Sequence, residues 1–272
     1  MNNFKIKSYA KINLALNVTG KTSKLHKIES IISFINLHDV INLKVTNNKA
    51  HKVSFIGKFS KNINEKNTVS MLLKLLDKKK LLKDKKFDIK IIKNIPQQAG
   101  MGGGSMNASS LINFFIKKKL IKVKKSELVK LAKLIGSDVI LGIKPSDSIL
   151  STNGKIKKFD KQAKLHVLAV KPNFGCSTKY IYSKVNTFTK SQFNLQKRSM
   201  FKIDYLKTLN NDLEKIVFNK YPRLEKIKLF LLTIPNTIFV RMSGSGSSII
   251  AYFHSKKACG IAYSQFKRKF SS

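Results

Sequence analysis

Hydrophobic and polar residues alternate along much of the first part of the chain, a pattern typical of half-buried β-strands. Apolar residues then recur on one helical face over residues 67–76, and alternation returns at 87–92, which predicts a helix followed by another strand. The strands predicted before this helix cover residues 4–9, 12–18, 28–36, 40–45 and 51–56. The chain therefore begins with a segment rich in β-sheet.

The rest of the chain mixes helical and strand-like patterns. Helical spacing predicts helices over residues 108–118, 127–135, 178–185, 211–219, 223–232 and 256–270. Apolar runs predict strands over residues 165–170, 238–242 and 248–253. Turn-forming residues at 146–148 and 151–154 mark the weakest boundary. Because the sequence has no repeat and no long linker, we expect its parts to pack together.

The net charge narrows the classes of protein that fit this pattern. The 272 residues include 54 Lys and Arg against 14 Asp and Glu, a formal charge of +40, yet 42% of the chain is hydrophobic. That apolar fraction excludes a disordered basic tail. The arginines are Arg198, Arg223, Arg241 and Arg268, so 54 − 4 leaves 50 lysines, which are dispersed. Since phosphate-binding surfaces favour arginine, we interpret the lysines as a solvated surface and keep a basic nucleic-acid-binding protein without catalysis as the lesser alternative.

Cysteines, histidines and hydropathy indicate the compartment. Cys176 and Cys259 lie far apart and fit no metal-ligand spacing, and the five histidines are scattered. No apolar run approaches the roughly 18 residues that span a bilayer, and the N-terminus has no apolar signal region. We therefore expect a cytoplasmic chain with reduced cysteines and no membrane partner.

The first candidate for chemistry is a glycine-rich segment ahead of a predicted helix. Gly100 and Gly102–Gly104 come just before residues 108–118. Glycines let backbone N–H groups approach an anion, and the helix dipole adds positive charge there, so the segment is a candidate polyphosphate cradle. It is neither a P-loop nor GxGxxG, because no Gly-Lys-Ser/Thr follows and Ser105 occupies the last glycine position. A flexible turn fits the glycines equally well.

Three further features are ambiguous when taken singly. Lys11 and Asn13 alternate with Tyr9 on one face of a predicted strand, but a single lysine says little in so lysine-rich a chain. Asp138, in the stretch Gly-Ser-Asp-Val, is one of only 14 acids, although an aspartate after a helix end is most often a cap. Residues 242–248, with the sequence MSGSGSS, join two predicted strands as a tight hairpin would.

In this order, the four features resemble the GHMP kinase superfamily. The ordered motifs are AKINL at residues 10–14, PxxxGxGGGSxNA at 96–108, GSDV at 136–139 and MSGSGSS at 242–248. Residues 16–20, 177–182 and 210–214 are in addition similar to the branch that phosphorylates a CDP-linked methylerythritol. The resemblance extends over essentially the whole chain.

This resemblance implies a fold and an activity. The fold would be that of an α+β kinase with two domains, a ribosomal-S5-domain-2-like ATP-binding domain over residues 1–158 and a ferredoxin-like domain over residues 159–272. The activity would be ATP-dependent phosphorylation of the 2-hydroxyl of the CDP-linked methylerythritol, in non-mevalonate isoprenoid precursor biosynthesis, with Mg²⁺ bridging the phosphates. The residues implied in ATP binding are Lys93, Pro96, Gly100, Met101, Gly102, Gly103, Gly104, Ser105 and Asn107. Lys93, with Asn67, would lie near the base and ribose, and Ser105 is a candidate Mg²⁺ ligand.

The resemblance assigns catalysis to Lys11 and Asp138. The acceptor is an unactivated alcohol, so a carboxylate placed to accept its proton helps the reaction. An ammonium group beside it stabilises both the carboxylate and the nascent alkoxide. Whether Asp138 removes the proton or orients the hydroxyl stays open at this point.

Acceptor recognition is where this sequence departs from the family pattern. The residues implied in substrate binding are Asn13, His26, Tyr182, Gly244 and Ser245. The family usually has Gly-Tyr-His where this chain has Ser-Lys-Leu-His at residues 23–26, so Leu25 offers cytosine no aromatic face. We expect weaker cytidine binding or a compensating apolar contact, and we keep a GHMP kinase of homoserine, mevalonate or a sugar as an alternative. The expected partner is a small-molecule substrate and not a nucleic acid, with the chain a monomer or weak homodimer.

Overall fold

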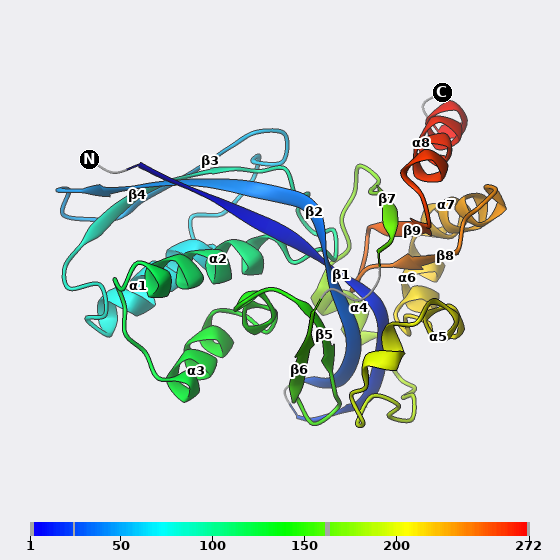
Figure 1. Cartoon of the computed structure of the whole chain (residues 1–272), viewed down its shortest axis with the longest axis horizontal. Coiled ribbons are helices and arrows are strands. Elements are labelled where there is room, and N and C mark those ends of the chain that lie inside the picture. Colours follow the sequence, from blue (N-terminus) through cyan, green and yellow to red (C-terminus); the bar gives the residue numbers. More distant parts are fainter. Residues whose placement is uncertain (1–2, 24, 161–163, 271–272) are drawn as a thin grey trace. The chain divides into compact units, whose positions relative to one another are not determined.

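The structure, a computed structural model, describes residues 3–23, 25–160 and 164–270. The chain folds as two compact units. Unit 1 consists of residues 1–11, 34–97 and 102–145, and unit 2 consists of residues 12–33, 98–101 and 146–272. Two long strands, β1 (Asn3–Lys21) and β2 (His26–Thr46), contribute residues to both units (Figure 1).

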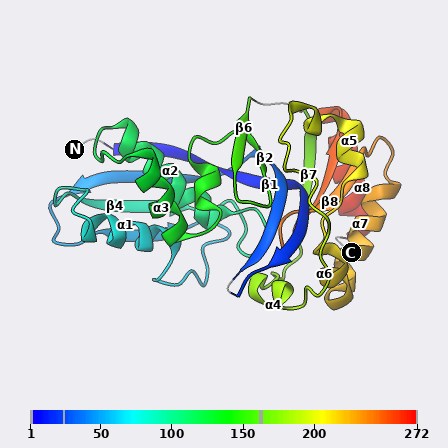
Figure 2. The same cartoon turned by 90° about the horizontal axis from the view of Figure 1, so that it is seen from below.

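Unit 1 is a sheet with helices on one face. Besides parts of β1 and β2, its elements are β3 (Lys52–Ile56), α1 (Thr68–Lys78), β4 (Lys86–Ile92), α2 (Gly103–Lys117), α3 (Lys125–Ile135) and the 3₁₀ turn η1 (Val139–Gly142). The end of β2 pairs antiparallel with β4, with Ile41 opposite Ile91, and β3 runs parallel to β4. Views from two directions place the three helices against the same face of the sheet (Figures 1 and 2). The core between these layers includes fully buried Phe87, Leu111 and Phe115.

Unit 2 contains two groups of strands. Besides parts of β1 and β2, its elements are β5 (Asp147–Leu150), β6 (Ile156–Phe159), β7 (His166–Val170), α4 (Thr178–Ser183), η2 (Arg198–Phe201), α5 (Ile203–Thr208), α6 (Glu214–Lys220), α7 (Pro222–Thr233), β8 (Phe239–Met242), β9 (Ile249–Phe253) and α8 (Lys256–Phe270). The start of β2 pairs antiparallel with β5, which pairs with β6. A separate antiparallel sheet has the order β7-β9-β8, and α7 and α8 pack against it around buried Leu224, Leu231 and Phe253.

The predicted α+β class is confirmed, and each predicted helix and strand has a counterpart in the described ranges. Two details are wrong. Residues 146–148 were expected to form a turn, but β5 begins at Asp147, because the Ser33 hydroxyl donates to Asp147 Oδ1 at 2.6 Å and satisfies this polar side chain inside the sheet. Helix α2 begins at Gly103 and not at residue 108, since the glycines form its first turn. Strand β6 and helix α5 were not predicted.

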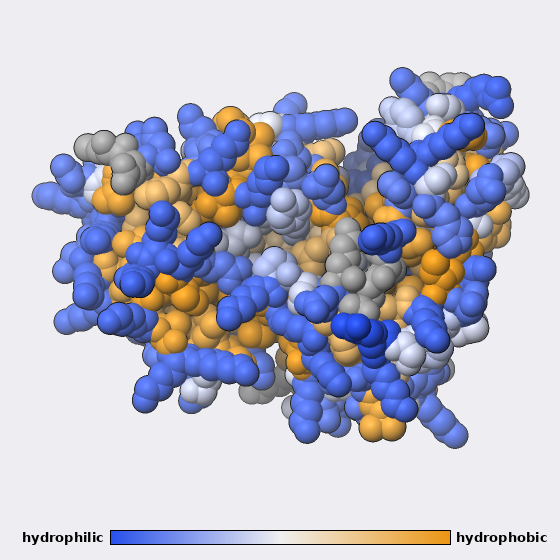
Figure 3. All heavy atoms as spheres, viewed as in Figure 1, coloured by the Kyte–Doolittle hydropathy of each residue, from blue (hydrophilic) through white to orange (hydrophobic). Residues whose placement is uncertain are grey.

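The surface agrees with the dispersed lysines of the sequence. Hydrophilic side chains are spread over the face drawn in Figure 3, with hydrophobic side chains between them. Among the helices of the described ranges, none is both long enough and apolar enough to cross a membrane.

Candidate active site

The helix that follows the glycine-rich segment begins at a residue without a side chain. Gly102 is the N-cap of α2, with a left-handed φ of 67°, and as a glycine it provides no side-chain acceptor for the first-turn N–H groups. Helix α1, in contrast, begins with a capping box in which Asn67 Oδ1 accepts from the N–H groups of Val69 and Ser70, both at 3.0 Å. The first-turn N–H groups of α2 are therefore not bound by an N-cap side chain, as those of α1 are, and they suit an external anion.

Lys11 and Asp138 form an ion pair within unit 1. Lys11 Nζ lies 3.2 Å from Asp138 Oδ2, and the two side chains are 6% and 33% exposed. Asp138 precedes η1, but in the described structure its side chain makes no capping hydrogen bond there, so the commonest role of an aspartate at such a position does not apply. A Cβ on Gly102 would lie 3.0 Å from Lys11 Cγ. The two predicted catalytic residues therefore meet beside the start of α2.

A buried aspartate that the sequence did not single out joins the two sides of the glycine-rich segment. Asp39, in β2, is 0% exposed. Its Oδ1 accepts from the backbone N–H groups of Asn94 and Ile95, each at 2.8 Å. Its Oδ2 accepts from Asn107 Nδ2 at 2.9 Å and pairs with Lys93 Nζ. Lys93, which was predicted to lie near the base and ribose of ATP, is thus buried and bound to a carboxylate.

The other two glycines at the start of α2, Gly103 and Gly104, lie near polar side chains. A Cβ on Gly103 would lie 3.2 Å from Lys93 Nζ, and one on Gly104 would lie 3.1 Å from Thr68 Oγ1. The Thr68 hydroxyl also donates to the Gly104 carbonyl at 2.7 Å, which connects the first turns of α1 and α2. Pro96, before the segment, is half-buried. Side chains on these glycines would therefore collide with groups that position the segment.

In the ranges that the structure describes, no group of three or more His, Cys, Asp or Glu residues is placed to hold a metal ion. The Ser105 hydroxyl lies near the turn that contains Asp138, 3.6 Å from the position of a Cβ on Gly136. The Ser105 hydroxyl fits a Mg²⁺ ion that is held mainly by nucleotide phosphates, as hydroxyl ligands do in other phosphoryl-transfer enzymes.

In unit 2, the MSGSGSS hairpin packs against the beginning of the glycine-rich segment. A Cβ on Gly100 would overlap the carbonyl oxygen of Ser243. The Ser243 hydroxyl donates to the Gly100 carbonyl at 2.9 Å and accepts from the Asn13 N–H at 3.2 Å. Asn211 Nδ2 donates to the Gly244 carbonyl at 2.8 Å. Residue 100 must therefore be glycine to allow this close approach. The hairpin also brings the predicted substrate-site residues Asn13 and Gly244 close to residue 100.

Two other predicted residues of unit 2 are held by the protein itself. The Ser245 hydroxyl lies 2.8 Å from that of Thr178, within hydrogen-bond distance. Met101 is 1% exposed, so this residue belongs to the interior.

His26 lies among aromatic rings in unit 2. Its ring centroid is 5.2 Å from that of Tyr182 and 6.5 Å from that of Phe188. Burial, and secondly the charge of Lys21, lowers the pKa of His26. Its Nε2 is buried and has no hydrogen-bond partner in the described part of the chain. Leu25, the departure from the family pattern, is 73% exposed, while Lys24 before it lies outside the described residues.

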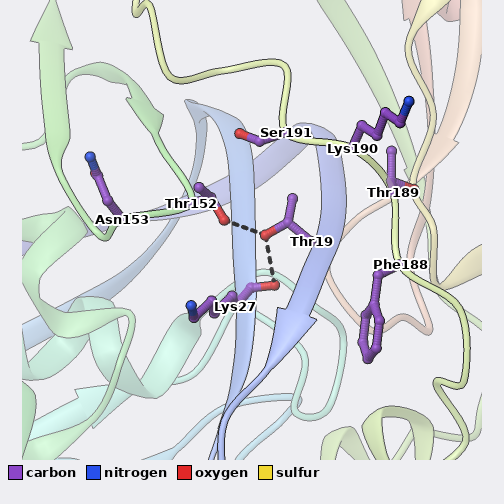
Figure 4. A pocket seen from close by; sticks show the side chains of 8 residues that line it. All are labelled: Thr19, Lys27, Thr152, Asn153, Phe188, Thr189, Lys190 and Ser191. Carbon is purple, nitrogen blue, oxygen red and sulfur yellow. Dashed lines mark hydrogen bonds between the residues drawn. The ribbon is translucent and has the colours of Figure 1, made fainter.

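A pocket of about 460 Å³ also lies in unit 2. Its lining residues are Thr19, Lys27, Thr152, Asn153, Phe188, Thr189, Lys190 and Ser191. The four hydroxyls among them hydrogen-bond within the protein. The amines of Lys27 and Lys190 point away from each other (Figure 4). Because its polar groups do not converge, we assign no ligand to this pocket.

Similarity to known proteins covers the whole chain. Residues 67–155 match the family described as GHMP kinases N terminal domain. The chain is 68% identical to the 4-diphosphocytidyl-2-C-methyl-D-erythritol kinase of Pelagibacter ubique (strain HTCC1062), over 100% of this chain and 97% of that protein. It is 32% identical to the kinase of the same name from Clostridium kluyveri, over 97% of this chain and 96% of the relative.

Solved structures share the fold at lower identity. A crystal structure of 4-(cytidine 5'-diphospho)-2C-methyl-D-erythritol kinase matches with a TM-score of 0.78 and 19% identity, over 97% of this chain and 96% of that one. Homoserine kinase from Cytophaga hutchinsonii matches with a TM-score of 0.70 and 17% identity, over 100% and 91%. These structures establish the fold, and the closer sequence relatives establish the family. The chain belongs to the 4-diphosphocytidyl-2-C-methyl-D-erythritol kinase family of GHMP kinases.

Proposed function

We propose that this kinase transfers the γ-phosphoryl group of ATP to the 2-hydroxyl of 4-diphosphocytidyl-2-C-methyl-D-erythritol, in isoprenoid precursor biosynthesis. A bond forms between the acceptor oxygen and the γ-phosphorus, the β–γ phosphoanhydride bond breaks, and the hydroxyl proton is released. The observation that supports this best is the Lys11–Asp138 pair, at 3.2 Å, beside the N-terminus of α2. The name of the relative with 68% identity supports the choice of acceptor.

The start of α2 is the proposed site for the ATP phosphates. Its first-turn N–H groups follow a glycine N-cap, while those of α1 are bound by Asn67. A phosphate at α2 would satisfy these N–H groups and interact favourably with the helix dipole. Mg²⁺ bound to the phosphates would neutralise part of their charge, with Ser105 as the proposed protein ligand.

Asp138 and Lys11 are the proposed catalytic residues. The Asp138 side chain is 33% exposed, so one carboxylate oxygen can meet an acceptor hydroxyl while the other faces Lys11. The carboxylate would hold the hydroxyl in line with the γ-phosphorus and accept its proton as the new bond forms. Lys11, with a side chain only 6% exposed, would place its amine beside the acceptor oxygen, which becomes negative as its proton leaves.

His26 and Tyr182 are the proposed cytidine contacts. The lowered pKa of His26 favours the neutral ring at neutral pH, so its nitrogens can both donate and accept a hydrogen bond. The buried Nε2 has no hydrogen-bond partner among the described residues. A nitrogen that binds a ligand would be in this state before the ligand arrives. Tyr182 lies beside this ring and offers a stacking surface, and Phe188 is the proposed apolar contact that compensates for Leu25.

The direct test is to mix the purified chain with ATP, Mg²⁺ and 4-diphosphocytidyl-2-C-methyl-D-erythritol. We expect ADP release that depends on the acceptor, and a product whose mass is higher by one phosphate. A reaction without the acceptor controls for ATP hydrolysis by the enzyme or by contaminants. ADP release no faster than in this control would refute the proposed function.

A second candidate is a GHMP kinase with a different small alcohol as acceptor. The exposed Leu25, at the position where the family pattern has an aromatic residue, is the observation that favours it. Homoserine, mevalonate and a sugar would then replace the CDP-linked acceptor in the same assay. A thermal-shift comparison separates the two candidates, because only a cytidine-binding site is stabilised by CMP and not by ribose 5-phosphate.

A further inference from the structure

We propose that Asp39 is a positioning residue for the nucleotide site, and that its carboxylate holds the glycine-rich segment in its binding conformation before ATP arrives. This inference rests on the proposed assignment of that segment to ATP binding. It concerns a residue that touches neither substrate, and its effect would pass through the segment that Asp39 holds.

The hydrogen bonds of Asp39 reach both ends of the segment. The N–H groups of Asn94 and Ile95, which donate at 2.8 Å, precede the glycines in the chain. Asn107, which donates at 2.9 Å, follows them in the first turns of α2. One fully buried carboxylate thus fixes the point where the chain enters the segment and the point where it leaves. A loop ordered in advance loses less conformational entropy when its ligand binds, so nucleotide affinity increases.

Lys93 connects the carboxylate of Asp39 to the first turn of α2. Its amine pairs with Asp39 Oδ2 and lies 3.2 Å from the position of a Cβ on Gly103. The amine therefore lies next to the first residue of α2, on the side of Gly103 where a Cβ would be. Without Asp39, Lys93 would be a buried cation without its carboxylate partner, and it would move or draw water into the site.

A second ion pair in the same unit serves as a matched control. Asp77, in α1, pairs with Lys86 at 2.7 Å and with His51 at 3.2 Å. Like Asp39, it bonds a lysine and a second polar side chain. In the part of the chain that the structure describes, its partners Lys86 and His51 lie outside the glycine-rich segment and outside α2. Asp77→Asn therefore removes a carboxylate and an ion pair from unit 1 without releasing the segment.

The experiment compares the wild-type chain, Asp39→Asn and Asp77→Asn. For each full-length protein, nucleotide affinity is measured by titration with a methylanthraniloyl derivative of ADP, KM is measured separately for ATP and for the acceptor, and thermal unfolding is recorded. We expect Asp39→Asn to weaken ADP binding and raise KM for ATP by about tenfold, with KM for the acceptor unchanged. We expect Asp77→Asn to lower the unfolding temperature and to leave nucleotide affinity unchanged.

Unchanged nucleotide affinity in folded Asp39→Asn would overturn the inference, and so would an equal loss in Asp77→Asn. If Asp39→Asn does not fold, Asp39→Glu decides, because it keeps a carboxylate for Lys93 but moves it by one methylene away from the N–H groups of Asn94 and Ile95. A several-fold loss of ADP affinity in that variant supports the inference, and wild-type affinity contradicts it.

Failure of the proposed function gives a different result. In that case the wild type binds the ADP derivative but transfers no phosphate to the acceptor, and the comparison of ADP affinities still applies.

Discussion

Asp138 shows how a residue that looks ordinary in the sequence acquires a role from its partner. After a helix end, an aspartate most often caps the next turn. In the described structure its side chain caps nothing, and it pairs with Lys11 at 3.2 Å. Lys11 is equally inconspicuous among 54 basic residues, yet its side chain is only 6% exposed. Burial of one lysine beside one partly exposed carboxylate distinguishes this pair from the solvated charges around it.

Replacing this carboxylate tests its chemical role. We expect Asp138→Asn to lower kcat by on the order of 10²–10⁴, because the amide keeps the shape of the side chain but cannot accept the hydroxyl proton. Steady-state ADP release and thermal unfolding should be measured together. Asp204→Asn, whose carboxylate is 100% exposed, is the control and should behave as the wild type. An Asp138→Asn enzyme with kcat close to that of the wild type would reduce Asp138 to an orienting role.

Arg241 is an arginine that lysine cannot replace. Its guanidinium, in a residue 4% exposed, donates to the backbone carbonyls of Leu14, Leu206 and Leu209. The planar guanidinium of arginine can donate to several separated acceptors at once. A lysine has a single ammonium nitrogen and cannot reach all three. We expect Arg241→Lys to lower the free energy of unfolding by about 2–4 kcal/mol, measured by urea denaturation. Arg223→Lys, at an exposed position, should change it by less than about 0.5 kcal/mol, and equal effects of the two would contradict this account.

The pH dependence of stability follows from His26. Its pKa is lowered by burial and by Lys21 from the ordinary value of 6.5, so between the folded and unfolded pKa values the unfolded chain binds more protons. The stability contributed by this group is therefore present above pH 6.5 and is lost as the pH falls through the lowered pKa. We expect the unfolding temperature of the wild type to fall more between about pH 7.5 and 5.5 than that of His26→Gln, since glutamine does not titrate. If the unfolding temperatures of the two proteins fall equally over this pH range, the lowered pKa of His26 is contradicted.

At the scale of elements, the glycine-rich segment is shaped by its neighbours as much as by a ligand. Gly102 has a φ of 67° and lies against Lys11, whereas Gly154 has a φ of 79° with nothing near its Cβ position. Both positions disfavour a side chain for the same backbone reason. Only at Gly102 does a methyl group also displace a proposed catalytic residue.

These two glycines separate backbone strain from an effect on the site. We expect Gly102→Ala and Gly154→Ala each to lower the free energy of unfolding by about 1–2 kcal/mol. Only Gly102→Ala should lower kcat, because its Cβ would lie 3.0 Å from Lys11 Cγ and push the ammonium group away from Asp138. Denaturation curves and initial rates provide the two measurements. Equal rates in both variants would show that Lys11 tolerates the displacement.

The sequence predicted elements well where their signals are local. Periodicity located the helices and strands because each pattern lies within the element itself, as in α1 and β4. Strand β5 was missed because Asp147 favours a turn until the Ser33 hydroxyl binds it. Asp39 was missed for a similar reason, since its side-chain partners Lys93 and Asn107 lie 54 and 68 residues away in the chain. Lys11 and Asp138 were found only because the order of motifs resembles a family, and no local pattern identifies such a pair.

At the scale of the whole molecule, the charge of +40 is a background that acts on every anion. ATP and the CDP-linked acceptor are both polyanions, so a dispersed positive surface raises their concentration near the protein. The same charge attracts nucleic acid, but buried and paired residues such as Lys11 and Lys93 have no function in nonspecific binding. The pattern of burial therefore favours a kinase with a basic surface over a nucleic-acid-binding protein.

The effect of this charge can be measured through ionic strength. Added salt screens exposed charges beyond about 10 Å at 0.1 M, so we expect KM for ATP to rise several-fold between about 0.05 and 0.5 M salt while kcat changes little. Thermal unfolding over the same range controls for a loss of folded protein. A KM for ATP that does not respond to salt would show that the surplus lysines have no part in substrate capture.

The division of the chain between the two units also determines which unit is synthesised completely first. The last segment of unit 1 ends at residue 145, whereas unit 2 combines residues 12–33 and 98–101 with residues 146–272. Strand β1 hydrogen-bonds the far end of the chain, since the Leu16 N–H donates to the Asn210 carbonyl at 3.1 Å and the Asp212 N–H donates to the Leu16 carbonyl at 2.9 Å. Because synthesis runs from the N-terminus to the C-terminus, β1 is made well before these partners. The strand that contains Lys11 must therefore wait for residues 210–212 before these hydrogen bonds can form.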